Sequence, residues 1–149
     1  FMRPDAGRVL QGIAVNLPSN GMPEIRTPFG QQTVGIAGAL TMMLAEESDR
    51  AANRLSVESA IIRGILTDGL PLVRNEAHAA VSAALATPAP PDILVSSLLT
   101  ENDALRAGLI ALHAAVEQLE TPEGRAMDDR IWAELVESTR RRDFQAKML

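Results

Sequence analysis

The sequence contains no cysteine and no tyrosine, and its 149 residues include only one tryptophan and three phenylalanines. Without cysteine the chain can form neither a disulfide nor a thiolate nucleophile or metal ligand. The scarcity of aromatic side chains disfavours a strand-rich fold, because strands draw on β-branched and aromatic residues. These absences favour a helical protein of reducing surroundings.

Charge and hydropathy exclude two further classes of partner. The net charge is −5, whereas a protein that binds nucleic acid normally carries a basic face, so we expect no nucleic-acid partner. No apolar run reaches the roughly 18 residues that a membrane span needs. The start of the sequence shows no basic segment followed by a hydrophobic stretch. We therefore expect a cytoplasmic protein with no membrane partner.

The composition that is present belongs to a globular helical chain. Hydrophobic residues make up 46% and charged residues 22%, and the apolar share is rich in Ala, Leu and Met, which favour helices. A chain of this length usually forms one core. We predict a single helical domain over residues 1–149, with a proline-rich break at 87–91.

The pattern of apolar residues, prolines and glycines predicts an all-α bundle of about five helices. The predicted helical segments are 4–17, 31–66, 71–85, 93–119 and a last helix that begins at Thr121 and Pro122. In the long second segment one broad apolar stripe contains Val34, Ala37, Leu40, Leu44, Ala51, Leu55, Ile62 and Ile65. Its polar middle, 46–50, leaves open whether the segment is one helix or two. Residues 18–30 read as an irregular connection whose Ile25 and Phe29 contact the core.

The segment 93–119 carries a heptad pattern. Its two rows are Leu98, Leu105, Leu112 and Leu119, and Val95, Asn102, Leu109 and Val116. A leucine zipper with one buried Asn has this pattern, so these eight residues are candidates for an interface between subunits. Apolar residues outside the seam widen the face, which favours a helix inside a bundle. Both interpretations stay open.

A short internal similarity at a spacing of 43 residues indicates two paired helices. Residues 55–63 resemble residues 98–106, with Leu, Glu and Arg identical in place. Two helices that pack antiparallel would bring Glu58 and Glu101 near related arginines. Chance similarity between amphipathic helices is the alternative explanation.

The sequence offers few catalytic or metal-binding patterns. The Glu-x-x-His motif of di-metal bundles, the Gly-x-Ser-x-Gly elbow and the P-loop are all absent. His113 and Glu117 lie one helical turn apart, and a surface pair is the ordinary reading of such a spacing. We predict no catalytic residue, no metal site and no cofactor.

Three segments give the chain a resemblance to a known family. They are Arg8-Val9-Leu10 through Leu17, Met22-Pro23-Glu24, and Leu44-Ala45-Glu46-Glu47. Their order resembles a family of uncharacterised bacterial all-helical proteins, with a short first helix, a Leu-Pro-like bend and a long helix ending in an acidic pair. Members of that family tend to be encoded near acyl-CoA dehydrogenase-like and aminoglycoside-phosphotransferase-like enzymes. The resemblance covers the first half of the chain, implies at most an accessory role, and assigns no functional residue.

Two hypotheses for function follow. The first is a non-catalytic protein that acts through protein–protein contacts, as a homodimer or as an accessory subunit. The second is a carrier of a small apolar molecule such as an acyl chain. In the second hypothesis Gly35, Gly38, Met42 and Met43 leave an apolar gap between helices, and Arg26, Gln31 and Thr33 contact the polar head of the ligand.

Overall fold

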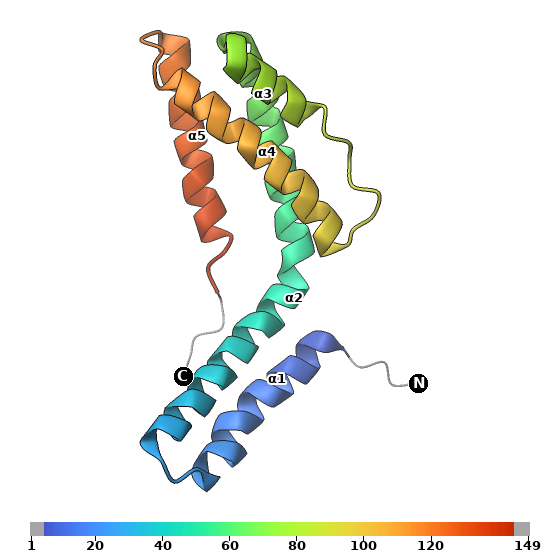
Figure 1. Ribbon diagram of the computed structural model, residues 1–149, viewed down its shortest axis with the longest axis vertical. Coiled ribbons are helices and arrows are strands. Elements are labelled where there is room, and N and C mark those ends of the chain that lie inside the picture. The colour runs from blue at the N-terminus through green and yellow to red at the C-terminus, as the bar shows by residue number, and fades with distance from the viewer. Residues whose placement is uncertain (1–4, 145–149) are drawn as a thin grey trace. The chain divides into compact units, whose positions relative to one another are not determined.

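The computed structural model describes residues 5–144, and within them all regular structure is helical. Five α-helices follow one another along the chain (Figure 1): α1 (Ala6–Asn16), α2 (Pro28–Gly69), α3 (Asn75–Leu85), α4 (Val95–Val116) and α5 (Pro122–Arg140). The prediction of an all-α bundle of about five helices is confirmed. None of the helices in the described range has the length and hydrophobicity that crossing a membrane would require.

Side chains at the helix starts explain two of these boundaries. Asp5 caps α1, since the backbone N–H of Gly7 donates to its Oδ1 at 3.0 Å. Thr121 caps α5 in the same way through the N–H of Gly124 at 3.1 Å, and Pro122 fills the first helical position. The beginning of the last helix was therefore predictable from a cap followed by proline.

The connection between the first two helices differs from the prediction. Instead of an irregular loop, Leu17–Gly21 form a π-helical turn and Met22–Glu24 a 3-10 turn. Phe29 does not contact the core, because α2 begins at Pro28 and leaves the Phe29 side chain 80% exposed on its first turn. Ile25 is only half-buried.

The second helix is a single helix of 42 residues without a break at 46–50. Arg50 and Glu46 form an ion pair one turn apart in this polar middle, which supports helix there. The described residues nevertheless divide into two compact units inside this helix: unit 1 runs to Ala51 and also includes Phe144, and unit 2 is Ala52–Asp143. The sequence points to 87–91 as its clearest break, whereas the boundary between the two units lies just after the polar middle of α2, within an uninterrupted helix.

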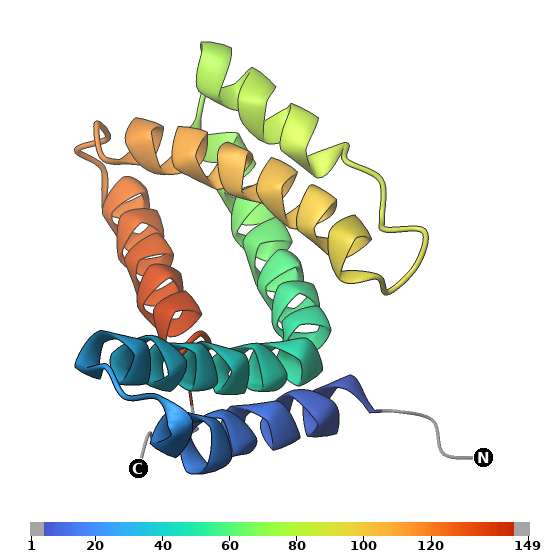
Figure 2. The same cartoon turned by 60° about the horizontal axis from the view of Figure 1, so that its bottom comes forward.

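Unit 1 is a helical hairpin of α1 and the first half of α2 (Figure 2). The two helices approach closely at Gly38, where an added Cβ would lie 3.1 Å from the carbonyl oxygen of Ala14 and 3.0 Å from Cγ of Pro18. From residue 5 to residue 51 the buried positions are Ala14, Gly38, Ala45 and Ala51. No large apolar side chain is fully buried in this part of the hairpin.

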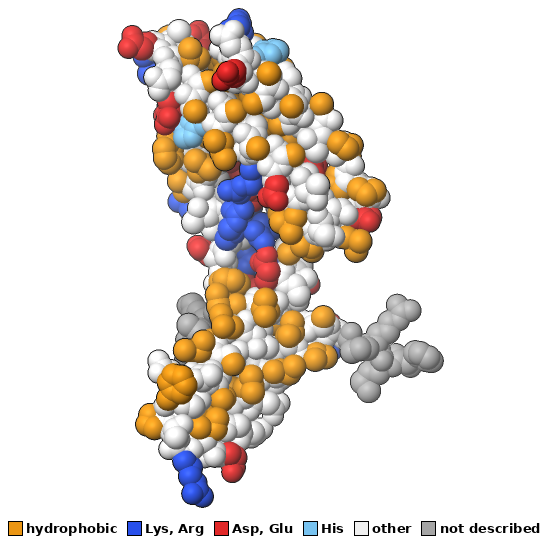
Figure 3. All heavy atoms as spheres, viewed as in Figure 1, with side chains coloured by type: hydrophobic (Ala, Val, Ile, Leu, Met, Phe, Trp, Pro, Cys, Tyr) orange, Lys and Arg blue, Asp and Glu red, His pale blue; other side chains and the backbone are white. Residues whose placement is uncertain are grey.

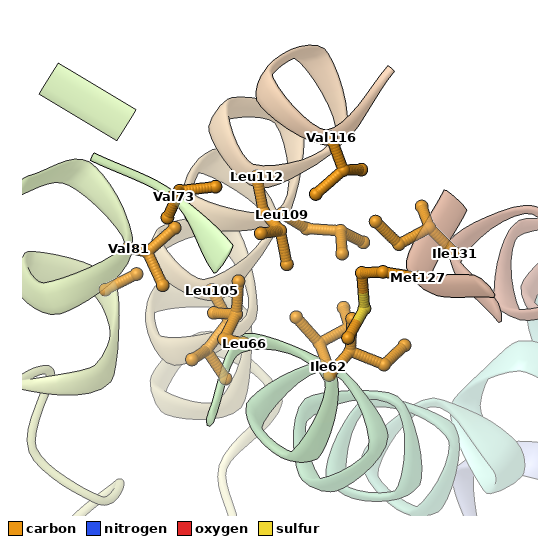
Figure 4. Close-up of a cluster of buried hydrophobic side chains, with 12 residues drawn as sticks. Ile62, Leu66, Val73, Val81, Leu105, Leu109, Leu112, Val116, Met127 and Ile131 are labelled. Atoms are coloured by element: carbon orange, nitrogen blue, oxygen red, sulfur yellow. The ribbon is translucent and has the colours of Figure 1, made fainter. Parts of the chain in front are cut away.

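Unit 2 has a core of large apolar side chains from the rest of α2 and from α3, α4 and α5. Figure 4 shows ten of them: Ile62, Leu66, Val73, Val81, Leu105, Leu109, Leu112, Val116, Met127 and Ile131. Gly108 lets α4 approach α3, because an added Cβ would lie 2.4 Å from Cβ of Ala84. The two units therefore differ in the size of the side chains that they bury.

Candidate functional site

The heptad of the fourth helix lies mostly inside unit 2. Six of the eight candidate interface residues are buried in the chain's own structure: Leu98, Asn102, Leu105, Leu109, Leu112 and Val116. Val95 is 41% exposed, and Leu119 is half-buried. The helix is also shorter than the predicted 93–119. This burial favours the interpretation as an internal bundle helix over the zipper interface, because the seam already has partners within one chain.

The three residues proposed to contact a ligand head are all exposed and two of them bond to nearby backbone. The Gln31 side-chain amide donates to the carbonyl of Ile25 at 3.0 Å, and the Thr33 hydroxyl donates to the carbonyl of Phe29 at 2.8 Å. Arg26 is exposed on the turn before α2. Their side chains do not converge on an enclosed apolar space in the described structure.

Three pockets bear on the carrier hypothesis: a polar one in unit 1 and two smaller ones in unit 2. A pocket of about 560 Å³ in unit 1 is lined largely by polar and charged side chains, among them Asp5, Arg8, Glu46 and Asp49. A pocket of about 100 Å³ in unit 2 lies between α4 and α5 next to His113. A carrier site normally offers about 300 Å³ or more of mostly apolar space, and neither of these two pockets has that character. A third pocket, beside the proline-rich segment 87–91, is mostly apolar, but its volume of about 270 Å³ stays below that size.

A layer of buried charge joins α2, α4 and α5 in unit 2. Glu58 is 1% exposed, and both of its carboxylate oxygens accept from Arg142, at 2.8 and 3.1 Å. Arg106 donates to the same carboxylate from α4. Figure 3 shows Lys and Arg side chains gathered beside acidic ones on one face of the molecule. Each carboxylate in this layer has guanidinium partners, as a buried charge requires.

The internal similarity at a spacing of 43 residues is visible in this layer as reciprocal pairing. Glu58 of α2 pairs with Arg106 of α4, while Arg63 of α2 pairs with Glu101 of α4 at 2.7 Å. Asn102 donates to the hydroxyl of Ser59, the equivalent position, at 3.2 Å. The predicted pairing of these two segments, with both glutamates near arginines, is confirmed. Its role is structural, since all of these groups satisfy one another.

Glu134 on α5 lies at the edge of the same layer. Burial raises the pKa of its carboxyl above the usual value of 4.5, and the ion pair with Arg141 lowers the pKa again without cancelling the effect of burial. A raised pKa in a cleft can mark a general acid. Burial and the pairing with Arg141 account for this shift, so we attribute it to packing.

His113 has a partner that the sequence analysis missed. Its Nε2 lies 2.9 Å from Oδ1 of Asp128 on α5 and 3.7 Å from Oε1 of Glu117. The Trp132 ring packs edge-on against the imidazole, with centroids 5.3 Å apart. The His and the two carboxylates form a group that could hold a divalent cation. The hydrogen bond from α4 to α5 accounts for the arrangement without an ion. Asp128 could not be paired with His113 from sequence, because the pairing depends on how the two helices cross.

The feature without a structural explanation is an apolar stripe on the first half of α2. We define the stripe as Phe29, Ile36, Leu40 and Leu44, which are 80%, 53%, 54% and 59% exposed. At roughly 100° per residue these positions share one face of the helix, opposite the face of Gly38 and Ala45 that packs on α1. Figure 3 shows hydrophobic side chains exposed over this unit. Leu40 and Leu44, which the sequence analysis placed on one broad apolar stripe with Val34, are exposed, because the small residues of α2 occupy the contact with α1.

The helix face that carries the stripe has the spacing of a helix–helix seam. Phe29, Thr33, Ile36, Leu40 and Met43 alternate at intervals of four and three residues, the spacing of coiled-coil contacts. From Pro28 to Ala45 the helix carries no charged residue. A helix that is apolar on two opposite faces normally has a partner on each. Within the described residues of unit 1, only the face of small residues has one.

Comparisons with known proteins identify no relative of this chain. No protein-family model, no curated protein and no solved structure matches the chain. The resemblance to a bacterial helical family therefore stays a prediction, and the function must be argued from the site itself.

Proposed function

We propose that the protein is a non-catalytic, cytoplasmic accessory protein that acts through protein–protein contacts, and that the stripe on α2 is its contact surface. The observation that carries the proposal is that unit 1 buries small side chains and exposes large apolar ones. From residue 5 to residue 51 its buried positions hold nothing larger than alanine, while four large apolar side chains of the stripe face outward.

The energetics of the hairpin support a partner. Burying a Leu, Ile or Phe side chain contributes roughly 1.5–3 kcal/mol relative to leaving it exposed. Two helices with a seam of Ala and Gly gain little of this, and exposed apolar patches on monomeric proteins commonly mark an interaction site. A partner on the stripe would supply the burial that the hairpin lacks.

Unit 2 exposes a second group of apolar side chains at the start of α4. Ile93, Leu94, Val95 and Leu99 are 83%, 61%, 41% and 43% exposed. This unit already has a core of large side chains, so its stability does not depend on covering them. The stripe on unit 1 is therefore the stronger candidate.

The alternative of an apolar-ligand carrier lacks a comparable observation. The pocket of unit 1 is lined by charged side chains, and the predicted head-group residues bond to local backbone. An apolar ligand could contact the stripe, but an open helix face does not enclose a small molecule as a binding pocket does.

Photo-crosslinking distinguishes the two functions. A photoreactive phenylalanine analogue is placed at position 40 in the cell that makes the protein, and the adduct is weighed by mass spectrometry. A matched control carries the analogue at Ala133, an exposed position of α5.

An adduct of polypeptide mass at position 40, absent at position 133, is the expected result. An adduct with a small apolar molecule at position 40 would establish the carrier function instead. No adduct at position 40 would refute the stripe as a contact surface for either.

A further inference from the structure

We infer that the partner of the stripe is a second copy of this chain, with the two α2 helices antiparallel across a two-fold axis that passes near Ile36. This inference rests on the proposed contact function of the stripe and names its partner. Two hairpins joined in this way form a four-helix assembly, with the two α2 stripes in contact and each α1 on the outer side of its own α2.

The area of the stripe is sufficient for such a contact. Taking about 200 Å² as the whole accessible surface of a large apolar residue, the exposed fractions of the four side chains leave roughly 500 Å² on each copy. Two copies then bury about 1,000 Å² from these side chains alone, which reaches the lower limit for a specific interface. Neighbouring half-buried side chains such as Met43 add to this area.

The sequence of the stripe is also self-complementary. An interface with two-fold symmetry uses the same patch on both copies, so each element must fit its own equivalent. The stripe is uncharged from Pro28 to Ala45, and no like charges would meet in its centre. A different partner chain would need a separate apolar groove, whereas a second copy presents the required surface by definition.

The charges at the two ends of the stripe are compatible with the antiparallel orientation, which the experiment below tests. Glu47 lies on the same face as the stripe, by helical periodicity, just beyond Leu44. Exposed Arg26 lies at the other end, beside the start of α2, where the helix dipole is positive. Antiparallel pairing brings Glu47 of each copy to Arg26 of the other. Parallel pairing would set Glu47 against Glu47.

The spacing of the stripe fixes the register. An axis near Ile36 places Phe29 opposite Leu44 of the other copy and Leu40 opposite Thr33, so that every large side chain of the stripe meets the other copy. At about 1.5 Å per residue, the two Phe29 positions are then roughly 22 Å apart along the helices. A disulfide needs Cα atoms about 4.4–6.8 Å apart, so position 36 can link to itself and position 29 cannot.

The absence of cysteine from the chain makes this register testable. Single variants Ile36→Cys, Phe29→Cys and Leu44→Cys of the full chain are oxidised, alone and as a mixture of the last two. The control variant Ala133→Cys, on α5, measures how much disulfide forms by random collision between molecules. Light scattering gives the mass of the wild type and of Leu40→Arg over a hundredfold range of concentration. Ile110→Arg is the matched control, since Ile110 is 72% exposed on α4.

The expected wild-type mass is that of a dimer, with Ile36→Cys linking to itself and Phe29→Cys linking only to Leu44→Cys. Leu40→Arg should raise the dissociation constant at least about tenfold, while Ile110→Arg leaves it unchanged. Its circular dichroism should keep the helical signal, which separates loss of association from loss of folding.

Three results would overturn the inference. A wild-type monomer at every concentration excludes the second copy, and a polypeptide adduct at position 40 would then still support the proposed contact function with another protein. Self-linking of Phe29→Cys indicates a parallel pair. A dimer that survives Leu40→Arg and gives no link at position 36 uses another surface.

Discussion

At the scale of single residues, Glu58 shows how the interior of unit 2 accommodates charge. Its carboxylate is buried and is shared by Arg106 of α4 and Arg142, which follows α5. The two guanidinium groups keep access to water, since their side chains are 40% and 38% exposed. The buried carboxylate of Glu58 thus connects α2, α4 and the segment after α5. The two arginines that pair with it remain partly exposed to water.

Replacing Glu58 by Gln should lower the free energy of unfolding by about 1–3 kcal/mol, because both arginines lose a desolvated partner. The cost stays below that of a fully buried pair since the arginines can turn toward water. Urea unfolding followed by circular dichroism measures the change.

Glu137→Gln is the matched control for that substitution. Glu137 pairs with Arg140 on the surface of α5, with side chains 50% and 67% exposed. Such exposed pairs contribute about 0–1 kcal/mol. Equal losses in the two variants would show that burial of Glu58 does not strengthen its pairing.

At the scale of helices, glycine marks where two elements approach. Gly64 of α2 and Gly108 of α4 both lie inside long helices, where Ala is favoured over Gly by about 1 kcal/mol. Their surroundings differ. An added Cβ at Gly64 would have Nη2 of Arg130 as its nearest neighbour, at 3.9 Å, whereas at Gly108 it would lie 2.4 Å from Cβ of Ala84.

The same substitution should therefore have opposite effects at the two sites. Gly64→Ala should raise the free energy of unfolding by about 0.5–1 kcal/mol. Gly108→Ala should lower it by about 1–3 kcal/mol, because α3 must move away from α4. Chemical unfolding of the two variants checks both signs. A stabilised Gly108→Ala variant would mean that α3 and α4 separate at little cost.

The helices themselves were largely predictable from sequence, and their partners were not. The cap at Thr121 and the heptad of α4 both involve residues that are close in sequence. The spacing of residues along the chain is therefore enough to predict them. Whether Leu40 and Leu44 are buried or exposed depends instead on which face of α2 packs against α1. Gly38 and Ala45 determine this face, because their small side chains permit close contact between the helices. The same small size makes them inconspicuous in the hydrophobic pattern of the sequence. The spacing of these leucines is visible in the sequence, but spacing alone does not show which apolar face of the helix is exposed.

At the scale of the whole molecule, the two units differ in what stabilises them. Unit 2 buries large side chains such as Ile62, Leu105 and Ile131. Unit 1 buries only small ones up to Ala51. Resistance to local opening follows buried apolar contact, so the two units should open with different free energies although α2 belongs to both.

Hydrogen exchange read by mass spectrometry on the full chain can test this difference. Amides in α1 and in residues 28–44 of α2 should exchange faster than those in α4 and α5, because opening unit 1 exposes little new apolar surface. If a second copy covers the stripe, protection in unit 1 should rise with protein concentration by mass action, and protection in the core of unit 2 should stay constant. Leu40→Arg should remove the concentration dependence from unit 1 without changing unit 2. Protection in unit 1 that equals that of unit 2 at the lowest concentration would mean that the hairpin is stable alone, and the apolar stripe would then serve binding without being needed for folding.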